Sequence, residues 1–159
     1  METNKKTIIV FSGDFDKVMA ALIIATGAAA MGDQVTMFFT FWGLNAIRKP
    51  QKVKAGKKSF LQKMFGMMMP RGINKLGLSK MNFMGLGVPL MNKVIKAKGA
   101  MTLTQLLEAA REQGVKLVAC TMTMELLGFS KEELLDGVEL AGVAGYLAEA
   151  DEANVNLFI

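Results

Sequence analysis

The chain has 159 residues, 52% of them apolar, which suits one compact domain, and its longest apolar stretch, residues 18–31, is shorter than the roughly 20 residues that span a bilayer. A single cysteine and the absence of histidine exclude an intramolecular disulfide, the usual zinc sites and Cys–His or Ser–His catalytic pairs, so we expect neither a metal nor a cofactor. The net charge of +5 hides an asymmetry, because residues 48–98 hold 13 of the 19 basic residues and none of the 14 acidic ones.

The first part of the chain predicts a strand, a loop, a helix and a second strand. Residues 7–11 form a β-branched run without the features of a secretory signal, so we expect a cytoplasmic protein. A helix over residues 18–31 ends at Gly32, which suits a C-terminal cap. Residues 34–40 form a continuous apolar strand of the kind that is covered on both faces, and residues 41–47 start a helical turn.

The basic segment, residues 48–98, also holds half of the 14 methionines, and we expect it to be a distinct insertion in a single domain of residues 1–159. Ser59 and Gln62 make a capping box that opens a short basic amphipathic helix. Since methionine packs adaptably, this helix could be a flap over the protein's own site or an oligomer contact. Peripheral contact with an anionic membrane is the second interpretation. Nucleic acid is not expected as a partner, because the segment has no recognised nucleic-acid motif.

The rest of the chain continues the alternation of strands and helices. Thr102 and Gln105 make a capping box, and Ser130 and Glu133 make another. Strands are predicted at residues 115–119, 137–140 and 154–159, with a helix at residues 142–153. Five strands alternating with helices predict a three-layer α/β/α fold with a mainly parallel five-stranded sheet, flavodoxin- or Rossmann-like, in which ligands bind beyond the carboxyl ends of the strands.

Cys120 lies at such a strand end, directly before a predicted helix. Thr121 or Thr123 could cap that helix, and its amino terminus would then favour the thiolate over the thiol. Glu125, within one turn, opposes a second negative charge, and basic residues of the inserted segment could offset it. The competing interpretation is that Cys120 is an apolar core residue, which is the commonest fate of a free cysteine.

The loop after the first strand, residues 12–16 (SGDFD), is a weaker candidate. Ser12 and Gly13 precede a helix and could cradle an anion with their amides. Asp14 and Asp16 would repel a phosphate, and no glycine-rich nucleotide motif occurs, so a turn with a helix cap is the plainer interpretation. The two aspartates could also meet the basic segment of a neighbouring subunit.

Three stretches together resemble one known family: residues 12–49, residues 76–87 (LGLSKMNFMGLG) and residues 117–147. The most specific parts are FFTFWGLN and ACTMTMELLG. The family is the DsrE/DsrF-like sulfur-relay family, in its DsrE-like branch, sometimes labelled peroxiredoxin-like. The resemblance implies an α/β/α fold, homo-oligomers such as trimers or hexamers, and a cysteine at Cys120 that carries sulfur as a persulfide.

By the same resemblance, sulfur donor and acceptor proteins or small thiols are the partners, and several residues line the pocket: Ser12, Gly13, Phe41, Trp42 and Gly43. We expect the four residues after the cysteine, Thr121, Met122, Thr123 and Met124, to line the pocket as well, with the two methionines placed to limit access of water to the sulfur. Peroxidase activity is not expected, because Thr121 and Thr123 follow the cysteine, whereas peroxiredoxins have a threonine before it.

Three hypotheses follow from the sequence. The leading one is a sulfur carrier or sulfurtransferase with Cys120 as nucleophile. The second is a non-enzymatic oligomeric adaptor that docks a membrane surface or an acidic partner through the basic, methionine-rich segment. The third is a small-ligand or nucleotide binder that uses the strand ends.

Overall fold

The computed structural model describes residues 3–54 and 56–159. The strands are β1 (Lys5–Val10), β2 (Gln34–Phe39), β3 (Lys116–Cys120), β4 (Glu139–Ala141) and β5 (Val155–Phe158). The α-helices are α1 (Phe15–Ala30), α2 (Phe60–Met68), α3 (Gly87–Ala97), α4 (Leu103–Glu112), α5 (Thr121–Leu127) and α6 (Val143–Asp151). The 3₁₀-helices are η1 (Phe41–Ile47), η2 (Ile73–Lys75), η3 (Phe83–Gly85) and η4 (Lys131–Glu133).

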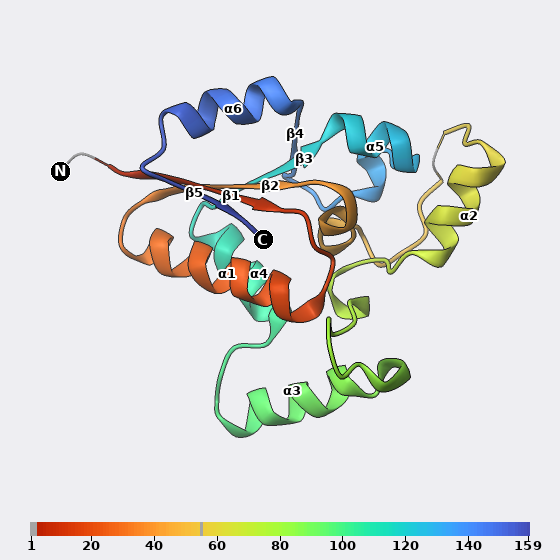
Figure 1. Ribbon diagram of the computed structural model, residues 1–159, viewed down its shortest axis with the longest axis horizontal. Helices are drawn as coiled ribbons and strands as arrows, with labels where there is room; N and C mark the ends of the chain where they lie inside the picture. The colour runs from red at the N-terminus through yellow and green to blue at the C-terminus, as the bar shows by residue number, and fades with distance from the viewer. Residues whose placement is uncertain (1–2, 55) are drawn as a thin grey trace.

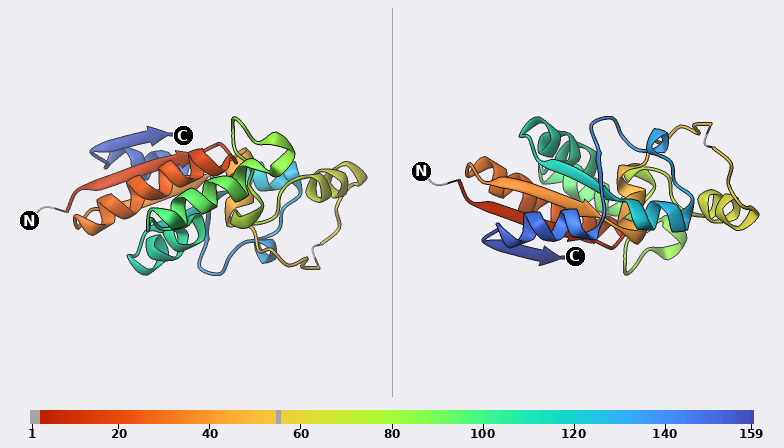
Figure 2. Two further views of the ribbon diagram at one scale, coloured as in Figure 1. Left: turned by 90° about the horizontal axis from the view of Figure 1, so that it is seen from below. Right: turned by 90° about the horizontal axis from the view of Figure 1, so that it is seen from above.

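The five strands form one parallel sheet in the order β4-β3-β2-β1-β5, which confirms the predicted α/β fold. Figures 1 and 2 show α1 and α4 on one face of the sheet and α6 on the other. The register pairs Val10 with Phe39 and Phe39 with Ala119, so β1, β2 and β3 end at one edge. No helix in the described part of the chain is long and apolar enough to cross a bilayer.

The side chains of the sheet divide between two apolar clusters. The larger cluster lies between the sheet and α1 with α4, and it includes Leu117 and Ala119 of β3. The smaller one lies on the face covered by α6. Its buried members are Phe38, Val118, Cys120 and Tyr146. Because successive side chains of a strand point to opposite faces, the register of β3 directs the Cys120 side chain toward α6.

Local sequence signals agree with most of the helix starts. Two of the three predicted capping boxes are complete, Ser59 with Gln62 and Thr102 with Gln105. At the third, which opens the short helix η4, the Ser130 N–H donates to the Glu133 carboxylate, but the Ser130 hydroxyl has no hydrogen-bond partner within the described residues. The fourth strand was expected at residues 137–140 but covers Glu139–Ala141, because Gly137 adopts a left-handed turn (φ 86°) before it.

The basic segment contributes α2, η2, η3 and α3, and it is tied to the first loop of the domain. Ser79 donates two hydrogen bonds, from its N–H and its hydroxyl, to the Asp16 carboxylate. The N–H of Phe15 donates to the carbonyl of Gly77 at 2.8 Å. Asp16 therefore binds the basic segment of its own chain. The helix α2 lies at one end of the molecule, beyond the carboxyl edge of the sheet (Figure 1).

Two loops approach each other closely at the carboxyl edge of the sheet. A Cβ added at Gly43 would lie 2.0 Å from the Val10 carbonyl oxygen, and one added at Gly13 would lie 2.5 Å from the Trp42 carbonyl oxygen. The N–H of Gly43 donates to the Phe11 carbonyl at 2.9 Å. Glycine is required at both positions because the opposing atoms belong to the backbone and cannot move aside.

We predict that Gly43→Ala lowers the free energy of unfolding by at least about 2 kcal/mol, since the added methyl group has no space. Gly27→Ala is the matched control, because Gly27 lies inside α1 with nothing within 4 Å of the added Cβ. That change should raise the free energy of unfolding by about 0.5 to 1 kcal/mol through helix propensity. Urea denaturation measures both. Equal stability of the two variants would contradict the close approach at Gly43.

Candidate functional site

Cys120 is both the last residue of β3 and the N-cap of α5, so the strand passes into the helix without a loop. The position at the carboxyl edge of the sheet is the one expected from the sequence. The N–H groups at the start of α5 are close to the sulfur. A side chain at this point combines the rigid placement of a central strand with the electropositive end of a short helix.

The predicted cap of α5 is wrong. Thr121 is the first helical residue, and no side chain caps the helix. Thr123 instead turns its hydroxyl to the sulfur, donating to Cys120 Sγ at 3.5 Å. The same hydroxyl lies 2.8 Å from the hydroxyl of Thr40, the residue that follows β2. A chain of polar groups therefore runs from the end of β2 through α5 to the sulfur.

These contacts decide the acidity of the thiol. Burial would raise the pKa of Cys120, but four donors act against it: the Thr123 hydroxyl, the Thr123 N–H, the Thr40 hydroxyl and the Met122 N–H. The balance lowers the pKa of Cys120 below its ordinary value. Glu125 is exposed on α5 and directs its backbone carbonyl, as acceptor, toward Gln62 of α2.

The sulfur is nevertheless beneath the surface. Cys120 is 1% exposed and belongs to the cluster that Tyr146 of α6 completes. The ring of Phe38 packs against Tyr146 with 4.9 Å between centroids. Met122 is half exposed, whereas Met124 is buried. A reagent that reaches Cys120 Sγ must therefore displace part of this cover.

The loop residues expected to line a pocket are gathered at the carboxyl edge, but two of them serve backbone packing. Gly13 and Gly43 allow the close contact described above. Phe41 has a left-handed backbone (φ 46°), and its ring lies 5.4 Å from that of Phe11. Trp42 is 46% exposed, and Ser12 is partly exposed. These residues surround the strand ends at the carboxyl edge of the sheet.

Thr40 is the site residue that sequence reasoning missed. It sits between a predicted strand and a predicted turn, where a threonine carries no distinguishing pattern. Its role follows from the pairing of β2 with β3, which brings its hydroxyl beside that of Thr123. Within the described residues, no group of three or more cysteine or acidic side chains is placed to hold a metal ion.

Comparison with known proteins agrees with the fold. A model of the DsrE/DsrF/DrsH-like family matches residues 2–158. The chain is 60% identical over 158 residues to "Uncharacterized protein YrkE" of Bacillus subtilis strain 168, covering 99% of this chain and 98% of that protein. It is 36% identical over 163 residues to "Sulfur carrier protein DsrE2" of Allochromatium vinosum, covering both chains fully.

Two solved structures have a similar fold at low sequence identity. The ychN protein from Escherichia coli matches with a TM-score of 0.57 and 15% identity, covering 99% of this chain and 100% of that one. Protein MTH1491 from Methanobacterium thermoautotrophicum matches with a TM-score of 0.56 and 12% identity, covering 97% and 98%. With the family match over nearly its whole length, the chain belongs to the DsrE/DsrF/DrsH-like family.

Proposed function

We propose that this protein is a sulfur carrier that holds sulfane sulfur as a persulfide on Cys120 and passes it to an acceptor thiol. Family membership and the similarity to a protein named as a sulfur carrier support a role in sulfur relay. The observation that carries the assignment to Cys120 is the set of hydroxyl and N–H donors around the chain's one sulfhydryl group.

The transfer needs no imidazole base. The Cys120 thiolate attacks the terminal sulfur of a donor persulfide, a new S–S bond forms, and the donor's own S–S bond breaks with a thiolate as leaving group. An acceptor thiolate then attacks the terminal sulfur on Cys120 and releases the Cys120 thiolate. Two displacements balance without an external oxidant or reductant. Sulfur donor and acceptor proteins or small thiols are the partners of these steps.

Burial of the sulfur requires an opening step before transfer. The hydroxyl contact between Thr40 and Thr123 joins the end of β2 to α5, so α5 holds the sulfur on one side while Tyr146 of α6 covers it on the other. The helix α5 has only seven residues and ends at Gly128 in a left-handed conformation (φ 73°). Because so short a helix has little stability of its own, we infer that α5 moves when a donor reaches the sulfur.

We propose further that residues 1–159 are one domain with an insertion at about residues 48–98, and that the protein assembles as a homo-oligomer. Apolar side chains remain exposed along β4, α6 and β5. They are Leu140, Val143, Leu147, Val155 and Phe158. A carrier thiol that must stay reduced also favours a cytoplasmic location, which cell fractionation would test.

The persulfide prediction is tested by intact mass. After incubation with polysulfide and removal of free sulfur, the wild-type chain should gain the mass of one sulfur atom, and a reducing thiol should remove it. Cys120→Ser should gain none, because the chain has no other cysteine. The same gain on Cys120→Ser, or none on the wild type, would end the proposal.

A second prediction concerns the acidity of the thiol. Thr123→Val removes the hydroxyl that donates to Cys120 Sγ, so the pKa of Cys120 should rise. The midpoint of the pH profile for alkylation of Cys120 measures it, at a reagent concentration low enough that alkylation is slower than opening of the cover. Thr121→Val is the matched control and should leave the midpoint unchanged. A midpoint that stays in place for Thr123→Val would remove the proposed thiolate stabilisation.

The oligomer is tested by sedimentation velocity. Leu147→Glu places a charge among the exposed apolar side chains of α6 and should shift the protein toward the monomer. Met31→Glu, at the end of α1 and far more exposed, should leave the assembly unchanged. A wild-type protein that sediments as a monomer at micromolar concentration would contradict the prediction.

A further inference from the structure

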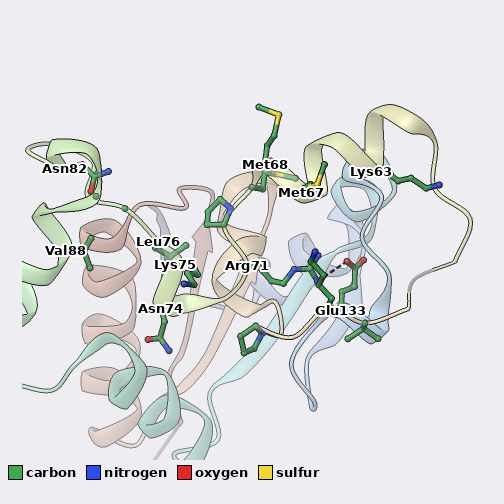
Figure 3. Close-up of a pocket in the computed structure, with 18 of the residues that line it drawn as sticks. Lys63, Met67, Met68, Arg71, Asn74, Lys75, Leu76, Asn82, Val88 and Glu133 are labelled. Atoms are coloured by element: carbon green, nitrogen blue, oxygen red, sulfur yellow. Dashed lines mark ion pairs between the residues drawn. The ribbon is translucent and has the colours of Figure 1, made fainter.

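A groove of about 1100 Å³ separates α2 from η3 and the start of α3. Figure 3 shows Met67 and Met68 on the α2 side, with Asn82 and Val88 opposite. Five basic side chains line the groove: Lys52, Lys58, Lys63, Arg71 and Lys75. Glu133 is the only acidic residue among the lining residues, so the groove carries an excess of positive charge.

Glu133 is shared by three cations. Its carboxylate lies 2.7 Å from Lys58 Nζ, 3.6 Å from Arg48 Nη2 and 3.7 Å from Arg71 Nη1. It also accepts a hydrogen bond from the N–H of Ser130 at 2.9 Å. One carboxylate balances one of these charges, and the ion pairs with the two arginines are too long for good hydrogen bonds. Figure 3 shows Arg71 reaching toward Glu133 from the chain after α2.

The excess of positive charge is most costly at Arg48, because its side chain is completely buried. Its Nε and Nη2 atoms find no hydrogen-bond partner among the described residues, and its guanidinium lies 4.1 Å from the centre of the Phe129 ring. Burial, followed by repulsion from Arg71, lowers the pKa of Arg48 to about 10. A buried cation is costly unless it is compensated, so additional negative charge nearby would stabilise this cluster.

We propose that the groove binds an oxyanion group, a phosphate, sulfate or carboxylate, against Arg71 and Lys58. The planar guanidinium of Arg71 matches such a group, and Lys58 adds a second charge. The groove is much larger than an inorganic anion, and its methionines offer an apolar surface that adapts to a ligand. The ligand class is therefore a small amphipathic anion, either a soluble molecule or the headgroup of a lipid.

Binding is measured by titration calorimetry at low salt, with inorganic phosphate and octyl phosphate as probes. We expect saturable binding, with octyl phosphate at least about tenfold tighter because its chain contacts the methionines. Arg71→Gln should weaken octyl phosphate about tenfold, since a hydrogen-bonded charge is lost. Circular dichroism confirms that each variant is folded.

Lys93→Gln is the control, because Lys93 is exposed on α3 and does not line the groove. It should bind octyl phosphate like the wild type. If Arg71→Gln does not fold, Lys75→Gln replaces it, since Lys75 forms no ion pair within the described chain. Absence of saturable binding to either probe, or equal weakening by Lys93→Gln, would overturn the proposal.

Flotation with phosphatidylglycerol vesicles separates the two sources of the anion. Flotation that octyl phosphate inhibits and Arg71→Gln abolishes assigns the group to a lipid headgroup, and binding of octyl phosphate without flotation assigns it to a soluble molecule. Binding of a polyglutamate peptide while neither phosphate probe binds would overturn the oxyanion site in favour of an acidic protein partner. Cys120→Ser should bind octyl phosphate normally, so this test is independent of the sulfur-carrier proposal.

Discussion

The backbone contact between the first two loops holds the carboxyl edge of the sheet together. Gly43 lies directly against the Val10 carbonyl, and Gly13 lies against the Trp42 carbonyl. A Cβ atom at either position would overlap with the carbonyl oxygen. This contact fixes η1 over the end of β1 and sets the path of the chain that leaves β2. Thr40 precedes η1, so the same contact determines where its hydroxyl points.

The hydrogen-bonding environment of the Cys120 sulfur depends on this backbone contact. The register of β2 and β3 brings Thr40 to Thr123, and Thr123 donates to Cys120. The donors favour the thiolate, whereas burial opposes it, and the donors prevail. The cover formed by Phe38 and Tyr146 keeps the sulfur away from solvent. The sulfur transfer proposed for Cys120 therefore requires that the cover opens on contact with a partner.

The basic segment is held by a different kind of interaction. Lys58 precedes α2 and Arg71 follows it, and both form ion pairs with Glu133. One buried carboxylate therefore fixes both ends of a helix that buries none of its own residues. Gln62 of α2 donates to the Glu125 carbonyl, which links this segment to the helix that begins after Cys120. The Cys120 site and the groove beside α2 therefore both contact α5.

The sequence by itself determined the alternation of strands and helices, two complete capping boxes, the location of Cys120 at a strand end and the charge asymmetry. These are local properties, since periodicity, caps and composition act over a few residues. Only the tertiary structure decided that Thr123 bonds the sulfur instead of capping α5, that Thr40 joins it, and that Arg48 and Arg71 converge on Glu133. The contact of Thr40 with Thr123 and the ion pairs of Glu133 join residues far apart in the chain, so their partners could not be read from the local sequence.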